Sequence, residues 1–395
     1  MEACLAAVLF AAPINLTLAA HADGSANSDP ATNAVVRSGT LSGSANLSST
    51  VERVLISGTY SPTLRFTDQS GAATGLFNAL QLSASGRSGR LTLTGGAGGT
   101  VGQEDFSPLA QSPVGAPGTA SPPPINRLPG TRFVSVGSAS AQLGAGYIFS
   151  SLLQAGASAG IATTGGVGAE AEALLPRQRS ATLATSGRWQ ADPLDALSGS
   201  ISSSVTTTGT PGATSEERAV TIGGQVTWAR RFSPTSSGTV GVGAAATRNS
   251  GSRLNQTSAL PTVSVSLAHT VPLRAQALSL SLSAATQPLV DPLTGAGYFQ
   301  ANASGALAYA PLSWLSLAGG VSGARAVSGP FAGQWGAVAE ASAGFRFSRR
   351  AAFSVGLREA KVLTVASAPA VPSLSQSSLQ WSAFAGVSSS LQEAF

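Results

Sequence analysis

The sequence is poor in charged residues, which make up 10% of its 395 residues, whereas soluble domains carry about 25%. Lysine occurs only as Lys361, so the net charge of +5 rests on arginine. The arginines are scattered along the chain and adjoin only at Arg230–Arg231 and Arg349–Arg350. A nucleic-acid surface needs clustered basic residues with aromatic residues between them. We therefore expect no nucleic-acid partner.

Catalytic residue types are equally scarce. Cys4 is the only cysteine, so disulfides are excluded. A serine hydrolase needs a histidine within reach of its nucleophile, but His21 lies in a predicted leader and His269 on the apolar face of a predicted strand. The acidic pairs Glu104-Asp105 and Glu216-Glu217 lie in predicted loops without metal-ligand spacing. We expect no enzymatic activity, no cofactor and no metal site.

Long apolar runs are also missing: after residue 22 none approaches the roughly 20 residues of a transmembrane helix. The apolar stretch from Leu5 to Ala20 ends in Ala20-His21-Ala22, which has the small residues that signal peptidase requires. We interpret residues 1–22 as a cleaved signal peptide; an N-terminal membrane anchor is the alternative. Residues 23–50 are rich in Ser, Ala, Asn and Gly, and we interpret them as a flexible segment.

What the sequence does contain is alternation of apolar and polar residues with a period of two. Val263, Val265 and Leu267 alternate with Ser264 and Ser266, a pattern typical of a strand and not of a helix. Similar stretches recur as pairs joined by a short turn and separated by longer polar loops. We count about sixteen strands, near residues 51–66, 76–86, 89–99, 132–147, 149–163, 178–190, 194–208, 216–231, 235–248, 259–271, 274–288, 298–309, 312–326, 333–347, 351–365 and 376–391.

These strands indicate a membrane barrel. The mean hydropathy is positive, at +0.20, and only helices and closed barrels satisfy their backbone hydrogen bonds in lipid. The polar faces consist of Ser, Thr, Gly and Gln, whereas a sandwich needs two apolar inner faces. Residues 51–395 are therefore predicted to be all-β: a single antiparallel transmembrane β-barrel of about sixteen strands, with fourteen or eighteen as alternatives. Aromatic residues beside the short turns predict an interfacial girdle: Tyr147, Phe149, Trp189, Trp228, Phe232, Tyr309, Trp314, Phe345, Phe347 and Phe353.

The end of the chain supports a family resemblance. A final alternating strand through Leu379, Trp381 and Val387 precedes a terminal Phe395. With the strand and loop layout, it resembles the Gram-negative outer-membrane β-barrel superfamily, porin-like members included. The resemblance covers residues 50–395 and is architectural. It implies export to the outer membrane, contact with outer-membrane lipid, and Phe395 as part of the signal read by the barrel-assembly machinery. By analogy with pores of this size, a homotrimer is an expected assembly.

Charged and amide residues on the polar faces are candidates for lining the lumen, because charges on the lipid face cost about 2–4 kcal/mol near the midplane. They are Arg53, Arg188, Gln225, Gln300, Asn302, Glu340, Arg346 and Arg358. They are expected to hydrate the interior and form ion pairs, and the excess of arginine predicts a weak anion preference. The leading function is passive diffusion of small solutes. The alternatives are a structural or surface-display barrel with a plugged lumen and binding loops, and a secreted adhesin-like β-protein.

Overall fold

The structure is a computed structural model that describes residues 14–28, 35–51, 53–67, 74–105, 133–209, 216–251, 255–273, 276–291, 295–329, 332–348, 351–363 and 377–394. Phe395 therefore lies outside the described residues. The strands are β1 (Ile14–Ser28), β2 (Val35–Val51), β3 (Val54–Thr67), β4 (Thr74–Ser88), β5 (Leu91–Asp105), β6 (Phe133–Ile148), β7 (Leu153–Gly166), β8 (Arg177–Gln190), β9 (Asp195–Gly209), β10 (Glu217–Ser233), β11 (Ser236–Ser250), β12 (Gln256–Leu273), β13 (Gln276–Val290), β14 (Gly297–Leu312), β15 (Leu315–Ala326), β16 (Trp335–Arg346), β17 (Ala351–Leu363) and β18 (Ser377–Ala394).

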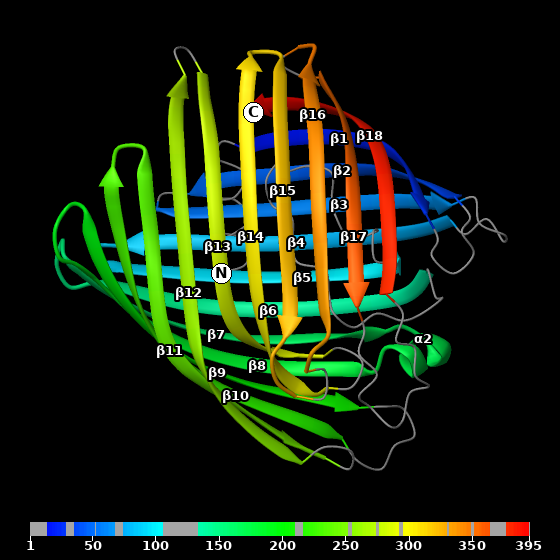
Figure 1. Cartoon of the computed structure of the whole chain (residues 1–395). Helices are drawn as coiled ribbons and strands as arrows, with labels where there is room; N and C mark the ends of the chain where they lie inside the picture. The colour runs from blue at the N-terminus through cyan, green and yellow to red at the C-terminus, as the bar shows by residue number, and fades with distance from the viewer. Residues whose placement is uncertain are drawn as a thin grey trace, which may run out of the picture.

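The strands form one antiparallel sheet that closes on itself. Each strand pairs with its neighbours in the chain, and β1 pairs with both β2 and β18. In Figure 1 strands β1–β7 cross strands β12–β17, as the opposite walls of a barrel with tilted strands do. Short turns join β2 to β3, β4 to β5 and so on, so one end of the barrel carries short turns and the other carries longer loops. The start of β1 and the end of β18 both lie at the short-turn end.

The predicted strand number of sixteen is wrong, because the barrel has eighteen strands. The sixteen predicted stretches correspond to β3–β18, and the two additional strands are β1 and β2. They were not counted because their alternation uses mostly Ala, Gly, Ser and Asn, and because Leu16–Ala20 is apolar enough to resemble a leader. Cleavage after Ala22 stays a prediction; it would divide β1, which pairs with β2 and β18 along its whole length.

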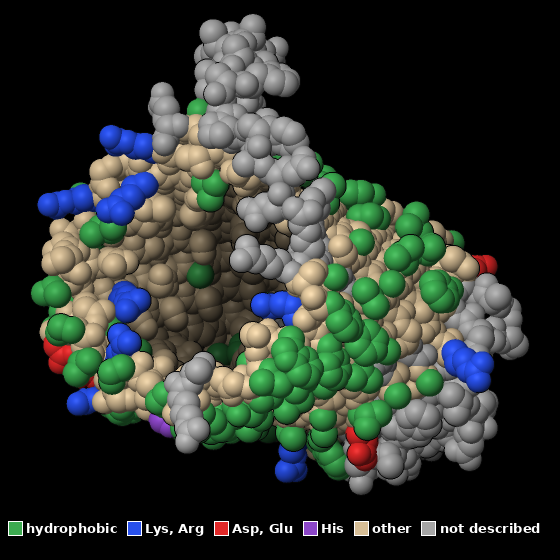
Figure 2. Space-filling view, turned by 90° about the horizontal axis from the view of Figure 1, so that it is seen from above, with side chains coloured by type: hydrophobic (Ala, Val, Ile, Leu, Met, Phe, Trp, Pro, Cys, Tyr) green, Lys and Arg blue, Asp and Glu red, His purple; other side chains and the backbone are tan. Residues whose placement is uncertain are grey.

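Alternation along each strand separates two faces. The outer face carries large apolar side chains that are mostly exposed, such as Leu143, Ile201 and Leu357. The inner face carries Ser, Thr, Gly and Gln, and the interior is hollow when seen from above in Figure 2. This is the arrangement that lipid outside and water inside require.

The aromatic girdle forms at the short-turn end. Trp189, Trp228 and Phe232 are exposed on the outer face there. The ring of Phe345 stacks between Trp314 and Phe353, with centroid distances of 6.3 and 6.2 Å. Tryptophan has an apolar ring system with a polar N–H and favours the membrane–water boundary, so the tryptophans and the phenylalanines beside them mark one edge of the apolar band.

Among the residues that the structure describes, the helix is α2 (Ala169–Leu174), in the loop between β7 and β8. Within the described ranges, no helix has the length and apolarity needed to cross a membrane. Ala171 and Leu175 pack against the inward-facing Val134 and Val136. The loop thus covers part of the inner wall at the long-loop end.

Closure through β1 can be tested by cross-linking. Ala20 and Ser389 are direct partners in the β1–β18 pairing, and directly opposed residues are close enough for a disulfide. The full chain with Ala20→Cys and Ser389→Cys is expected to form an intramolecular disulfide, detected by its migration on a non-reducing gel. In the control, Ala20→Cys with Ser388→Cys places the two thiols on opposite faces, so it should remain reduced. Equal cross-linking of both pairs would contradict the register.

Candidate functional site

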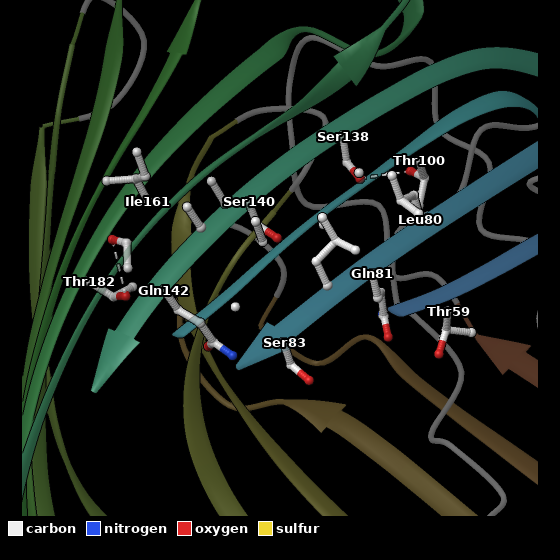
Figure 3. Close-up of a pocket in the computed structure, with 18 of the residues that line it drawn as sticks. Thr59, Leu80, Gln81, Ser83, Thr100, Ser138, Ser140, Gln142, Ile161 and Thr182 are labelled. Carbon is white, nitrogen blue, oxygen red and sulfur yellow. Dashed lines mark hydrogen bonds between the residues drawn. The ribbon is translucent and has the colours of Figure 1, made fainter. Parts of the chain in front are cut away.

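The barrel interior is the candidate site, and its lining differs in chemistry from one region to another. A cavity of about 490 Å³ lies against the wall formed by β3–β8. In this sector the lining side chains with polar groups are hydroxyls and amides, and none is charged (Figure 3). They are Ser57, Thr59, Gln81, Ser83, Thr100, Ser138, Ser140, Gln142, Ser180 and Thr182.

The hydroxyl groups of this wall bond to one another across strands. The hydroxyls of Ser57 and Ser83 are 2.6 Å apart, and those of Thr100 and Ser138 are 2.7 Å apart. On β5, between the serines of β4 and those of β6, the lining residues Gly96 and Gly98 have no side chain. Their small size leaves space for the cavity. The result is a neutral, wettable surface without a fixed charge.

Further along the inner wall, ionisable groups lie on β16, β17 and β1, outside the lining of this cavity. Glu340 and Arg358 are direct cross-strand partners on β16 and β17, and Arg358 is only 7% exposed. On β1, the Nε2 atom of His21 lies 3.3 Å from Oδ1 of Asp23, to which the Thr40 hydroxyl donates a hydrogen bond. Glu340 and Arg358 thus place opposite charges close together, so this pair contributes little net charge to the lumen.

The described residues of the link between β13 and β14, Asp291 and Gly295–Ala296, contact the inner wall of the barrel. Asp291 is 1% exposed, and its carbonyl oxygen accepts a hydrogen bond of 2.9 Å from Nε2 of Gln178 on β8. Strands β9–β12 separate β8 from β13 in the sheet, so this contact crosses the interior. The link therefore narrows the lumen at the long-loop end.

Two hydrogen bonds from one side chain secure this link. Asn249 on β11 donates from Nδ2 to the carbonyl of Gly297 at 3.0 Å and accepts from the amide of Gly297 at 2.8 Å. Two glycines, Gly295 and Gly297, allow the link to approach the wall this closely. A Cβ atom at Gly297 would lie 2.1 Å from Thr247, and one at Gly295, where φ is +71°, would lie 2.4 Å from the Thr208 hydroxyl.

Next to the link, an apolar cluster of one tyrosine and three alanines takes the place of the polar lining. Tyr298 is buried against Ala296, Ala324 and Ala326, with Leu289 at the edge of the cluster. The Tyr298 hydroxyl donates to the side-chain oxygen of Gln300 at 3.4 Å. This cluster holds the start of β14 against its neighbours beneath the link.

Arginines surround the opposite, short-turn mouth. Arg87, Arg188, Arg231 and Arg346 are inward-facing residues near the ends of β4, β8, β10 and β16. The end seen in Figure 2 carries basic side chains around the opening. The described acidic side chains at this end are Asp192 and Asp195. The latter lies on the outer face, 3.5 Å from Arg230. We refer to the four inward-facing arginines as the mouth arginines.

At the rim, Asp192 is held in a tight turn. Its Oδ1 accepts hydrogen bonds from the amides of Leu194 and Asp195, at 2.6 and 2.8 Å. These backbone hydrogen bonds lower the pKa of Asp192 below its usual value. The carboxylate is thereby held by the turn between β8 and β9.

The predicted lumen residues can now be placed. Gln225, Gln300, Asn302, Glu340 and Arg358 lie on the inner wall, and Arg188 and Arg346 lie on the inner face near the mouth. Nε2 of Gln225 donates to the Ser264 hydroxyl at 2.5 Å, across the side-chain-free position Gly241. Gln300 donates to Asn302 at 3.2 Å. Arg53 lies in the turn between β2 and β3 and not on the wall.

Two kinds of inner-wall residue are absent from the predicted set. Arg87 and Arg231 have the same inward parity as Ser85 and Ala229, so alternation could have identified them. Asn249 and Asp291 gave no local signal, because their role comes from contacts across the barrel. His269 lies on the outer face as expected, with Nδ1 2.6 Å from the Ser236 hydroxyl. In the described part of the chain, His, Cys, Asp and Glu form no group of three that could hold a metal ion.

Comparison with known proteins gives structural matches only. No protein-family model and no curated protein matches the sequence. The copper transporter OprC matches with a TM-score of 0.50 and 10% identity, over 96% of this chain and 82% of that one. The FrpB iron transporter (F5-1 variant) from Neisseria meningitidis matches with a TM-score of 0.51 and 9% identity, over 91% and 64%. CdiB from Acinetobacter baumannii matches with a TM-score of 0.46 and 11% identity, over 96% and 60%.

The fold is that of a Gram-negative outer-membrane β-barrel. The closed eighteen-stranded sheet and the matches to OprC and FrpB agree on this. The chain spans less than two thirds of the length of FrpB and of CdiB. The outer-membrane barrel fold explains why apolar side chains face outward and polar ones face inward.

The inward link gives a direct test at Asn249. Asn249→Ala would leave the buried amide and carbonyl of Gly297 without their partner, and each unpaired buried group costs about 1–3 kcal/mol. We expect a lower melting temperature of the folded barrel, measured by heat-modifiable migration on a gel. Asn78→Ala is the control, because it removes only an exposed hydrogen bond from Tyr60. An Asn249→Ala barrel as stable as the control would contradict the role of Asn249.

Proposed function

We propose that this barrel resides in the outer membrane and lets small hydrophilic solutes diffuse passively, with a weak preference for anions. The observation that carries the proposal is the hollow interior with a neutral hydroxyl wall along β3–β8. A wall of Ser, Thr and Gln keeps water and polar solutes in the lumen without binding them tightly. The proposal involves no catalytic step and no cofactor.

The mouth arginines support the anion preference. Their side chains are exposed at the short-turn opening, whereas Glu340 and Arg358 face each other within the wall. A ring of one charge at a mouth raises the local concentration of ions of the opposite sign. Selectivity is therefore assigned to the mouth and not to the middle of the lumen.

The transporters among the structural matches also fit a role in transport. OprC is named as a copper transporter and FrpB as an iron transporter. The neutral wall and the lack of a metal-binding group among the described residues favour unspecific small solutes over a metal cargo. This supports the diffusion proposal at the level of the fold.

A barrel with a plugged lumen is the second candidate, and the inward link favours it. The link between β13 and β14 and the loop carrying α2 both cover parts of the interior at the long-loop end. If they block the passage, the barrel would serve structure or surface display.

Single-channel recording separates the two candidates. The full chain, refolded and inserted in a planar bilayer, is expected to give stable conductance steps and a reversal potential on the anion side in a salt gradient. Insertion is verified independently by heat-modifiable migration. An inserted barrel without conductance would overturn diffusion and support the plugged barrel. A chain that stays soluble and never inserts would support the secreted β-protein instead.

A variant of the mouth arginines tests whether they set the ion selectivity. Replacing Arg87, Arg188, Arg231 and Arg346 by Gln is expected to lower the anion-to-cation permeability ratio about twofold or more toward unity, most clearly at low salt, where screening is weak. The control replaces Arg179, Arg218, Arg248 and Arg325, which face outward, by Gln. It changes the net charge equally and should leave the ratio unchanged. An equal shift in both variants would refute selectivity at the mouth.

A further inference from the structure

A second set of arginines lies on the outside of the barrel, at the long-loop end. These residues lie within a few positions of the strand ends, and all are exposed. We call them the arginine belt: Arg37, Arg177, Arg179, Arg218, Arg248 and Arg325. The belt is built from strands β2, β8, β10, β11 and β15.

Alternation places these side chains on the outer face. Arg218 has the parity of Ile222, and Arg325 has the parity of Val321; both apolar side chains are more than half exposed on the outer face. Arg248 pairs with Val220, which also faces outward. The belt therefore continues the apolar outer surface and does not face the lumen.

The belt lies one bilayer width from the aromatic girdle. On β10, Trp228 marks the girdle and Arg218 the belt; on β8 the corresponding residues are Trp189 and Arg179. In both strands the residues are about ten positions apart, which at about 3.3 Å per residue and a tilt of about 40° spans about 25 Å. This equals the apolar height of an outer-membrane barrel, so the guanidinium groups lie at headgroup level.

Few acidic side chains compensate the belt on this face. Arg177 forms an ion pair with Glu172 at 2.8 Å. Among the described residues, Glu216 and Glu359 also have outward parity near this end, whereas Glu217 and Asp291 face inward, so the acidic residues remain fewer than the six arginines. The outer rim at the long-loop end is thus basic.

Neighbouring belt residues can share one ligand. Arg248 is paired with Val220, two residues from Arg218 on the adjacent strand. Such diagonal neighbours are about 7–8 Å apart, within reach of long side chains that converge on one group. Guanidinium groups form paired hydrogen bonds with phosphate oxygens and can extend along an apolar surface to the headgroup region.

We propose that the arginine belt binds the phosphate groups of anionic lipids in the leaflet at the long-loop end. The proposal rests on the membrane placement of the proposed function, but not on an open lumen. Each basic residue near a charged membrane surface strengthens binding about fivefold. The belt then fixes the depth of the barrel, with aromatic rings at one boundary and arginine–phosphate contacts at the other.

The test compares lipid retention by two variants of equal charge. The full chain is refolded in vesicles of phosphatidylcholine containing a minor fraction of phosphatidic acid, then extracted in mild detergent, and the bound phosphatidic acid is counted by native mass spectrometry. Replacing Arg179, Arg218, Arg248 and Arg325 by Gln is expected to lower retention at least tenfold. Replacing the four mouth arginines by Gln should leave retention unchanged. Heat-modifiable migration verifies that each variant is inserted.

The outcomes are distinguishable. Equal loss in both variants would show a general effect of net charge, and no loss in the belt variant would show that the arginines do not hold the lipid; either result overturns the proposal. If the fourfold belt variant does not insert, the pair Arg218→Gln with Arg248→Gln is measured, with a several-fold loss expected. Arg218→Lys with Arg248→Lys retains the charge but not the forked geometry, so it should restore part of the binding. Absence of conductance would leave these results unaffected.

Discussion

The continuous ring of backbone hydrogen bonds is the constraint on which the rest of the structure depends. An unpaired backbone group in hydrocarbon costs several kcal/mol, so an open strand edge is not tolerated there. The pairing of β1 with β18, from Asn15 with Ala394 to Asn27 with Ser382, removes the last edge. Once the ring is closed, every side chain on a strand faces either outward or inward. Alternate side chains therefore face lipid and the water-filled lumen in turn.

Small residues leave space inside the barrel for the lumen, for long polar side chains and for the link. Glycines on β5 and β11 leave room for the lumen and for long side chains such as Gln225. Gly295 and Gly297 allow the β13–β14 link to approach the wall of β9–β11. The two named sets of arginines also differ in direction: the mouth arginines face inward at the short-turn end, and the belt arginines face outward at the long-loop rim.

Much of the wall could be predicted because alternation is a local property. The stretches predicted as strands match β3–β18, and Gln225, Glu340 and Arg358 lie on the inner face, the side that their parity indicates. Strands β1 and β2 were missed because alternation of Ala, Ser and Gly carries little contrast. Arg53 has the right parity for the wall, but the strand ends at Val51 and the residue lies in the turn.

The sequence by itself determined the sixteen strands β3–β18, which face of each is apolar, and where the aromatic girdle lies, because each of these depends on neighbours within one hairpin. The tertiary structure decided the number of strands, since closure requires residues near opposite ends of the chain to pair. It also decided that the β13–β14 link enters the lumen, through Asn249 with Gly297 and Gln178 with Asp291. Such contacts join residues far apart in the chain, and no local pattern encodes them.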